Sequence, residues 1–307
     1  MKRKKLIFAI LIIFLFSSGL FIQGQDYDVE IQATWGSSGD DFAYSLAVTS
    51  NNLFLAGYTN SFAGVGAFLA KFTLSPFNVV WSRGIGITSS AFYDVAIDIA
   101  NIFAVGYAFI DKSDRPVIIK FDQTDGSILW AQYLYIDPIE QHGRAFSITT
   151  LGDYYCLSGF LITKKEIGGI FACFDTDGKL NTRYSLIFST SGHDVIFYPY
   201  GIASFSSNLF LAGNTSDITM RGFIAKYDGT SLLVKTTPDS ALQNITSIAV
   251  DNTGNLYITG QYSNSILLAK FDSNLNVIYT KIIQVTGNEI GYSIALDSSN
   301  NIYIGGR

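Results

Sequence analysis

Two histidines and a few acids are the residues of this chain that could carry out acid–base or metal chemistry. Converging imidazole and carboxylate groups can ligate a metal ion or exchange protons with a substrate. The candidates are six residues of polar segments: His142, His193, Glu140, Asp194, Asp40 and Glu289. Neither histidine has a second ligand at the short spacing of known metal motifs. We therefore predict no catalytic, cofactor or metal site, and we interpret the six as polar loop residues.

Other signatures of chemistry are weaker still. The chain has no serine nucleophile elbow, phosphate loop or paired-cysteine zinc motif. Asp-rich segments at 122–126, 175–178 and 251–255 bring oxygen ligands together as calcium requires, but they lack the spacing of an EF-hand loop. Asp, Asn and Gly are also what hairpin turns need, so we predict turns. Asn214 in NTS and Asn244 in NIT match the N-glycosylation acceptor pattern.

A short sequence motif recurs six times along the rest of the chain. Its six copies are SLAVTSNNLFLAGYT (45–59), DVAIDIANIFAVGYA (94–108), SITTLGDYYCLSGFL (147–161), GIASFSSNLFLAGNT (201–215), SIAVDNTGNLYITGQ (247–261) and SIALDSSNNIYIGGR (293–307). Each copy contains one glycine that we align with the others: Gly57, Gly106, Gly159, Gly213, Gly260 and Gly305. A period of about 50 residues is typical of a supersecondary unit that is repeated in space.

Each unit has the pattern of four short strands. Two apolar runs are joined by a polar turn, a third run ends in a pair such as Lys71-Phe72, and a fourth run carries an aromatic such as Trp81. In the first unit we expect strands at 44–49, 53–57 and 67–73, followed by one at 78–83. The sequence therefore predicts an all-β fold, a β-propeller of four-stranded antiparallel blades with about six blades, the last one incomplete.

The recurrent side chains have structural explanations in such a fold. Aromatic residues make up 15% of the chain, and because they recur in register inside strands we expect core packing between blades rather than a stacking platform for ligands. Four lysines share one position of the repeat: Lys71, Lys120, Lys226 and Lys270. Equivalent positions of a propeller lie far apart around the ring, so we expect these lysines to be solvated or paired and not to form one anion site.

Three segments resemble the SBBP family of β-propeller repeats, and more weakly NHL repeats: GDDFAYSLAV (39–48), SIAVDNTGNLYITG (247–260) and YSIALDSSNNIYIGG (292–306). The resemblance covers residues 30 to 307. It implies a propeller in an exported protein and no shared catalytic residues. The third and fourth copies depart from it, since they lack the Asp after the first strand.

The first residues have the pattern of a secretion signal. Four basic residues at positions 2–5 precede an apolar run from Leu6 to Phe16, and small residues follow. We predict a signal peptide over 1–24, with an uncleaved N-terminal anchor as the alternative, and one β-propeller repeat domain over 25–307. The protein would then be extracytoplasmic, secreted or on the cell surface. Its mature form has 16 basic and 25 acidic residues, a net charge of −9 that excludes a nucleic-acid binder.

The two ends suggest how the ring closes. The segment EIQATWG (30–36) resembles a fourth strand without a blade of its own, and the sixth copy stops after two strands. Either the N-terminal strand completes an imperfect last blade, or the sequence is a fragment of a longer chain truncated at the C-terminus; we favour the fragment.

Cys156 and Cys173 are the only two cysteines. They fall in the second and third strands of one unit, and their midpoint lies at the hairpin tip between Lys164 and Lys165. A symmetric register places them opposite each other, so we predict that they can form a disulfide. An exported chain is a setting that permits it.

Two hypotheses for function remain. The first is an exported, non-catalytic propeller that acts as a binding or surface interaction scaffold, without a cofactor, for a protein or glycan partner at its loop rim. The alternative is an extracytoplasmic lyase or hydrolase, acting on glycans, that uses the His and acidic residues of that rim. We favour binding, because catalysis would gather titratable groups in the loops of one blade.

Overall fold

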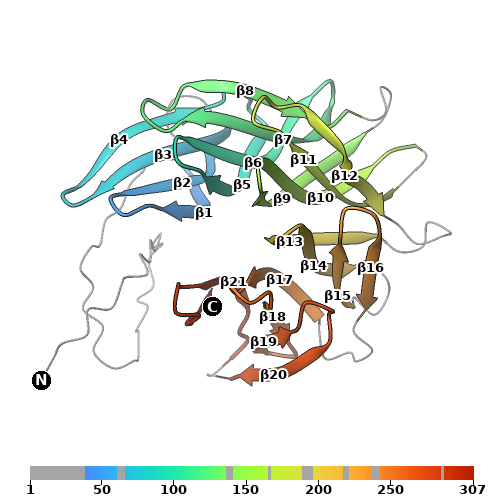
Figure 1. Cartoon of the computed structure of the whole chain (residues 1–307). Coiled ribbons are helices and arrows are strands. Elements are labelled where there is room, and N and C mark those ends of the chain that lie inside the picture. Colours follow the sequence, from blue (N-terminus) through green and yellow to red (C-terminus); the bar gives the residue numbers. More distant parts are fainter. Residues whose placement is uncertain are drawn as a thin grey trace, which may run out of the picture.

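The computed structural model describes residues 39–60, 66–135, 141–164, 167–188, 196–216, 221–236, 243–284 and 287–307 (Figure 1). All regular secondary structure in these residues is β-strand. The described residues also contain no helix that is long and apolar enough to cross a membrane. The predicted signal at 1–24 and the segment 30–36 lie outside them.

The first three units form four-stranded antiparallel meanders, the blades of the fold. Blade 1 contains β1 (Asp41–Val48), β2 (Asn52–Thr59), β3 (Gly66–Leu74) and β4 (Phe77–Gly84). Blade 2 contains β5 (Ser90–Ile97), β6 (Asn101–Ile110), β7 (Ser113–Asp122) and β8 (Ile128–Tyr133). Blade 3 contains β9 (His142–Leu151), β10 (Tyr154–Ile162), β11 (Ile167–Phe174) and β12 (Leu180–Phe188). The strands predicted for the first unit match those of blade 1 to within a few residues.

Two further units form complete blades, and the sixth is a hairpin. Blade 4 contains β13 (Phe197–Phe205), β14 (Asn208–Thr215), β15 (Gly222–Tyr227) and β16 (Leu232–Thr236). Blade 5 contains β17 (Gln243–Val250), β18 (Leu256–Tyr262), β19 (Ser265–Phe271) and β20 (Val277–Ile283). The sixth unit is incomplete in the described residues, with β21 (Gly291–Leu296) and β22 (Ile302–Gly306).

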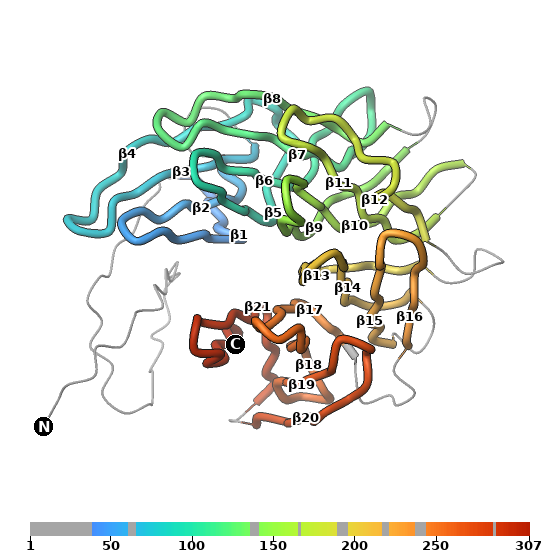
Figure 2. Tube along the Cα trace, viewed as in Figure 1, coloured from blue at the N-terminus to red at the C-terminus, as the bar shows by residue number. Residues whose placement is uncertain are grey.

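The blades are arranged in a ring, as the chain trace in Figure 2 shows. The first strand of each blade lies on the inner side and the fourth on the outer side (Figure 1). Each inner strand packs on the next, from β1 through β5, β9, β13 and β17 to β21. Five complete blades and a two-stranded sixth confirm the predicted β-propeller with an incomplete last blade.

The core lies between the blades. Strands such as β10 are almost continuously buried, because a neighbouring blade covers each face of the sheet. Between blades 1 and 2, for example, Phe54, Phe92 and Phe121 are fully buried in one cluster. Similar clusters fill the other contacts between consecutive blades. These buried rings have the packing role that was predicted for the aromatic residues.

Each blade also contains a close approach of its first two strands. The inner strand of every unit has a β-bulge, and the repeat glycine of the second strand lies beside it. A Cβ atom on Gly106 would stand 1.8 Å from the carbonyl oxygen of Ala91, and one on Gly57 would stand 1.9 Å from that of Phe42. No side chain fits there, so the repeat needs glycine for space and not for a turn.

The space around each glycine also corrects the alignment of the sixth copy. A Cβ on Gly305 would meet nothing within 4 Å, whereas one on Gly306 would stand 2.1 Å from the carbonyl oxygen of Ile290. The register agrees, because Gly306 lies opposite Gly291 just before the bulge. The repeat glycine of this copy is therefore Gly306, and the prediction of Gly305 was wrong by one residue. The sequence already favours Gly306, because the ungapped alignment of the fifth and sixth copies pairs it with Gly260.

We expect Gly106→Ala to lower the free energy of unfolding by at least about 2 kcal/mol, because the new methyl group must push two paired strands apart. Gly305→Ala is the matched control, a glycine of the same repeat with open space around it, and should change stability by no more than about 0.5 kcal/mol. Urea unfolding of both variants measures the difference. Equal stability of the two variants would contradict the packing explanation.

Repeated polar contacts join the outer parts of consecutive blades. The Nζ of Lys71 lies 5.8 Å from the ring centroid of Phe54, its cross-strand partner, and donates to the carbonyl of Gln123 in the next blade at 3.0 Å. The corresponding donor–acceptor pairs are Lys120 with Thr176 at 2.9 Å and Lys226 with Ser273 at 3.0 Å. These lysines are paired, as predicted, and they link blade to blade.

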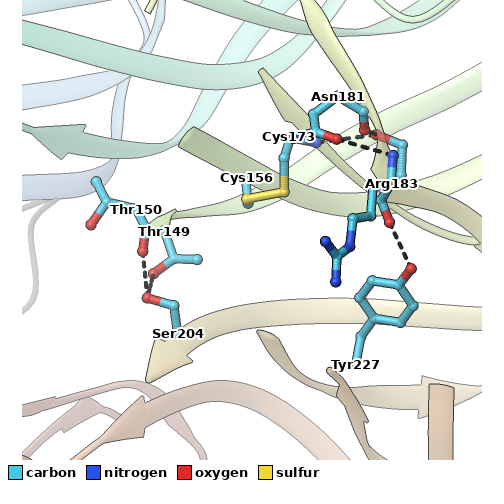
Figure 3. The surroundings of a disulfide bond; sticks show 9 residues. Thr149, Thr150, Cys156, Cys173, Asn181, Arg183, Ser204 and Tyr227 are labelled. Carbon is cyan, nitrogen blue, oxygen red and sulfur yellow. Dashed lines mark hydrogen bonds between the residues drawn. A yellow bond between two sulfur atoms is a disulfide. The ribbon is translucent and has the colours of Figure 1, made fainter. Parts of the chain in front are cut away.

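In blade 3 a disulfide takes the place of the cross-strand pair that Phe54 and Lys71 form in blade 1 (Figure 3). The register places Cys156 opposite Cys173, as the hairpin midpoint predicts, and the two are bonded with Cα atoms 4.0 Å apart. The lysine contact to the next blade is absent here, and Arg183 supplies a substitute. Its Nε donates to the carbonyl of Gly229 at 3.0 Å, and its own carbonyl accepts from the Tyr227 hydroxyl at 2.6 Å.

A half-buried carboxylate links the inner strands of the first three blades. Asp94 of β5 accepts hydrogen bonds from the hydroxyls of Ser45 at 2.7 Å and Ser147 at 2.8 Å. The backbone N–H groups of Val95 and Ile148 donate to it at 2.9 Å each. Burial raises the pKa of Asp94 above its ordinary value of 3.8, although the four donors act in the opposite direction. Four of the other five units carry serine at this position.

We expect this group to make stability depend on pH. A folded-state pKa above the unfolded value means that the stabilising contribution is complete below pH 3.8 and is lost as the pH rises through the raised pKa. The unfolding free energy of the native protein should therefore fall relative to that of Asp94→Ser over this interval. Denaturant titrations of both proteins at a series of pH values measure the difference. If the unfolding free energy of the native protein minus that of Asp94→Ser stays constant or increases as the pH rises, the assignment is contradicted.

Candidate functional site: an aromatic arc on the inner side of the ring

The bulge of each inner strand directs one side chain away from the regular ladder. Each bulged residue directly precedes the position that is Ser, Asp or Gly in the repeats. Five of these residues are aromatic, namely Tyr44, Tyr93, Phe146, Tyr200 and Tyr292, and the sixth is Thr246. The rings of consecutive blades touch. Centroids are 5.2 Å apart for Tyr44 and Tyr93, 5.9 Å for Tyr93 and Phe146, and 4.9 Å for Phe146 and Tyr200.

A second row of rings continues this cluster toward one rim. First strands begin and second strands end at that rim, because the two are antiparallel. Ring contacts join both rows in one network across blades 1 to 4. We call this network the aromatic arc, and it consists of Phe42, Tyr44, Tyr58, Tyr93, Tyr107, Phe146, Phe160, Tyr198 and Tyr200. None of the nine residues is fully buried.

The tyrosines of the aromatic arc keep unused polar groups. Burial raises the pKa of Tyr44, Tyr93 and Tyr200, so their hydroxyls stay neutral. The hydroxyl of Tyr93 accepts a hydrogen bond from Arg144 at 3.1 Å. Within the described part of the chain, five other phenol groups of the aromatic arc have no hydrogen-bond partner: Tyr44, Tyr58, Tyr107, Tyr198 and Tyr200. A ligand can therefore find both ring surfaces and hydrogen-bonding groups here.

One ion pair borders the aromatic arc. The guanidinium of Arg144 donates to the carboxylate of Asp114 through Nη2 at 2.6 Å and Nε at 3.0 Å, and it lies 4.2 Å from the ring centroid of Tyr107. Burial lowers the pKa of Arg144, but the hydrogen bond to Asp114 and the nearby groups outweigh burial and leave the pKa raised. The pair is thus fixed between blades 2 and 3 with its charges balanced.

Side-chain amides lie along the rim from blade 4 to the sixth unit. We call Asn214, Asn244, Gln261 and Asn288 the amide arc. Gln261 accepts from Asn244 Nδ2 at 3.2 Å and donates to Asn288 Oδ1 at 2.6 Å. Asn214 exchanges two hydrogen bonds with the backbone of Ile245, at 2.8 and 3.2 Å. Asn244 and Asn288 are exposed and keep polar atoms available to a ligand.

The structure separates the histidine and acid candidates. His142 begins β9, Asp40 precedes β1 and Glu289 precedes β21, so each belongs to a different blade. Glu140, His193 and Asp194 lie outside the described residues. Among the residues that the structure does describe, no three His, Cys, Asp or Glu side chains gather in a group that could hold a metal ion.

The remaining candidates have local partners. In the Asp-rich turns the carboxylate accepts hydrogen bonds from the turn backbone, as Asp251 does from the N–H groups of Thr253 and Asn255 at 2.9 and 2.8 Å. Lys270 adds an ion pair to Asp251 at 3.7 Å. Of the two glycosylation candidates, Asn214 has its amide engaged with the next blade, whereas Asn244 is exposed.

Sequence reasoning missed the aromatic arc. It assigned the aromatic residues to core packing, which holds for rings such as Phe54 but not for the nine residues of the arc. A signal was present, because Tyr, Tyr, Phe, Tyr and Tyr precede five of the six aligned Ser, Asp or Gly residues. In a strand of regular alternation this position would face a neighbouring blade. Only the bulge turns it toward the inner side.

The fold defines this chain as a β-propeller, and the solved structures that are similar to it include the following two. One is a catalytically inactive virginiamycin B lyase from Staphylococcus aureus with quinupristin, at 11% identity and a TM-score of 0.53, covering 86% of this chain and 84% of that one. The other is the Dos1 propeller, at 12% identity and a TM-score of 0.50, covering 86% of this chain and 67% of that one. At these identities the likeness concerns the fold alone.

No protein-family model matches the chain, and no curated protein is significantly similar to it. The resemblance to SBBP repeats therefore stays a prediction.

Proposed function

We propose that the protein is an exported, non-catalytic binding propeller whose ligand docks on the aromatic arc. The observation that carries this proposal is a continuous network of nine incompletely buried rings on the inner side of the ring. Contiguous apolar surface that is left accessible on a soluble domain marks an interaction site more often than a scattered exposed ring does. Aromatic residues are also the side chains that dominate binding energy at interfaces.

The position of the rings supports binding over packing. The core clusters between blades contain other aromatic residues, such as Phe54, Phe103 and Phe210, which are fully buried. The rings of the arc lie outside those clusters, and four of the nine stand at bulges. Loops between second and third strands end at the same rim and vary from the two-residue turn between β6 and β7 to the longer connection between β14 and β15. Variable loops around a regular scaffold are where recognition commonly lies.

Removing the rings should remove binding. We expect Tyr44→Ala/Tyr200→Ala to lose ligands that the native protein retains on arrays carrying glycans and peptides. The matched control is Tyr133→Ala, which removes a tyrosine of similar exposure from the outer strand β8: Tyr133 is 42% exposed, against 50% for Tyr44 and 36% for Tyr200. Retention by the control and loss by the double variant support the proposal. Equal retention by both variants, or no retained ligand at all, would contradict it.

Export is part of the same proposal. The basic and apolar start of the chain supports it, and so does the disulfide between Cys156 and Cys173, since such bonds persist in oxidising compartments. We expect N-terminal sequencing of the secreted protein to begin between Gly19 and Gln25. Leu11→Arg, which interrupts the apolar run, should block secretion. A full-length chain that is held in the membrane would instead support the anchor.

A further inference from the structure

We infer that the ligand of the aromatic arc is a neutral glycan built of pyranose units. This inference rests on the proposed function, since it requires that the arc is a binding surface. It is carried by three features of the described residues: the rings with their free hydroxyls, the amide arc that continues the rim, and the absence of net charge from both.

The rings match the apolar faces of sugars. A pyranose with mainly equatorial hydroxyls presents C–H bonds on its flat sides, and these carry a small positive charge. The faces of aromatic rings are negative, so such a sugar stacks on them. The exposed rings of Tyr44 and Tyr200 are linked through Tyr93 and Phe146, with centroid spacings of 4.9 to 5.9 Å along the inner strands. A chain of linked sugar units can therefore contact several rings at once.

The polar groups match the edges of sugars. A sugar hydroxyl both donates and accepts a hydrogen bond, and it is best met by groups that do the same. Phenol hydroxyls have this property, and carboxamides supply a donor and an acceptor side by side. The aromatic arc offers five hydroxyls without a partner in the described residues, and the amide arc adds exposed Asn244 and Asn288.

Charge argues for a neutral ligand. The ion pair that borders the aromatic arc, Arg144 with Asp114, is already closed at 2.6 Å. The raised pKa values of Tyr44, Tyr93 and Tyr200 keep the phenols uncharged. An acidic glycan or a phosphorylated ligand would find no unpaired cation among the residues of either arc.

The bulges argue against an extended peptide. A peptide that adds to a sheet edge needs a regular row of free N–H and C=O groups. Every inner strand that borders the arc is interrupted at the residue that carries the ring, for example between Ala43 and Ser45 in β1. A bulge disrupts such a row and twists the edge away from pairing.

Titration calorimetry of the purified full chain tests the inference, with cellohexaose, chitohexaose and maltohexaose as neutral probes and a galacturonic acid oligomer as the acidic probe. We expect at least one neutral probe to bind and the acidic probe not to bind. Tyr44→Ala and Tyr200→Ala should each weaken that binding about fivefold to tenfold through loss of stacking. Tyr44→Phe and Tyr200→Phe keep the ring and should stay within about threefold of the native affinity. Tyr133→Ala should bind as the native protein does, and circular dichroism confirms that each variant is folded.

The outcomes separate the two proposals. Binding of the acidic probe in preference to the neutral ones overturns the inference of a neutral ligand. If an array peptide binds in a way that depends on Tyr44 and Tyr200, and no glycan binds, the inference of a glycan ligand is overturned and the proposed function stands. If a neutral glycan binds the alanine variants as tightly as the native protein, its site lies elsewhere on the chain. That result overturns both the proposed function and the inference of a glycan ligand. A chain that binds no glycan probe also overturns the inference.

Discussion

The fold depends on one close approach, the contact between the first and second strands of each blade where only glycine fits. A Cβ atom at Gly57, Gly106 or Gly159 would lie 2.0 Å or less from a carbonyl oxygen of the inner strand. That contact and the bulge occur together, because the extra residue of the inner strand is accommodated against the missing side chain. The bulge in turn sets the direction of one side chain per blade, and this side chain is aromatic in five of the six units. A steric constraint inside the blade thus determines what lines the inner side of the ring.

Contacts between blades follow a common plan with local substitutions. In three blades a lysine beside an aromatic ring donates to the turn carbonyl of the next blade. In blade 3 a disulfide fills that pair of positions, and Arg183 makes the contact from another strand. Asp94 likewise stands where most units have serine, and it bonds to both neighbouring blades. The geometry of the repeat is therefore kept while its chemistry varies.

The sequence predicts the architecture because its signals are local: apolar runs, turn residues and a period that recurs. It predicts that Cys156 faces Cys173 for the same reason, since a short symmetric hairpin fixes the register. It does not predict the aromatic arc. Whether Tyr93 faces a neighbouring blade or the inner side depends on one unpaired residue, and bulges leave no distinct pattern in alternating apolar strands. The choice of Gly305 failed for a different reason: the ungapped alignment of the fifth and sixth copies pairs Gly260 with Gly306, and the strand pairing agrees with that alignment.

Because of the bulges, the packing of the blades and the recognition of a ligand depend on different residues. Residues of the ladders and of the buried clusters hold the blades together, whereas the bulged residues stand outside the regular ladder and touch one another along the inner strands. Blade 5 illustrates this, because Thr246 takes the place of an aromatic ring and the blade keeps its four strands. Such positions can accumulate substitutions at low cost to folding, which makes the inner side of the ring an evolvable surface. A lineage of these propellers could change what it recognises one blade at a time, with the scaffold left intact.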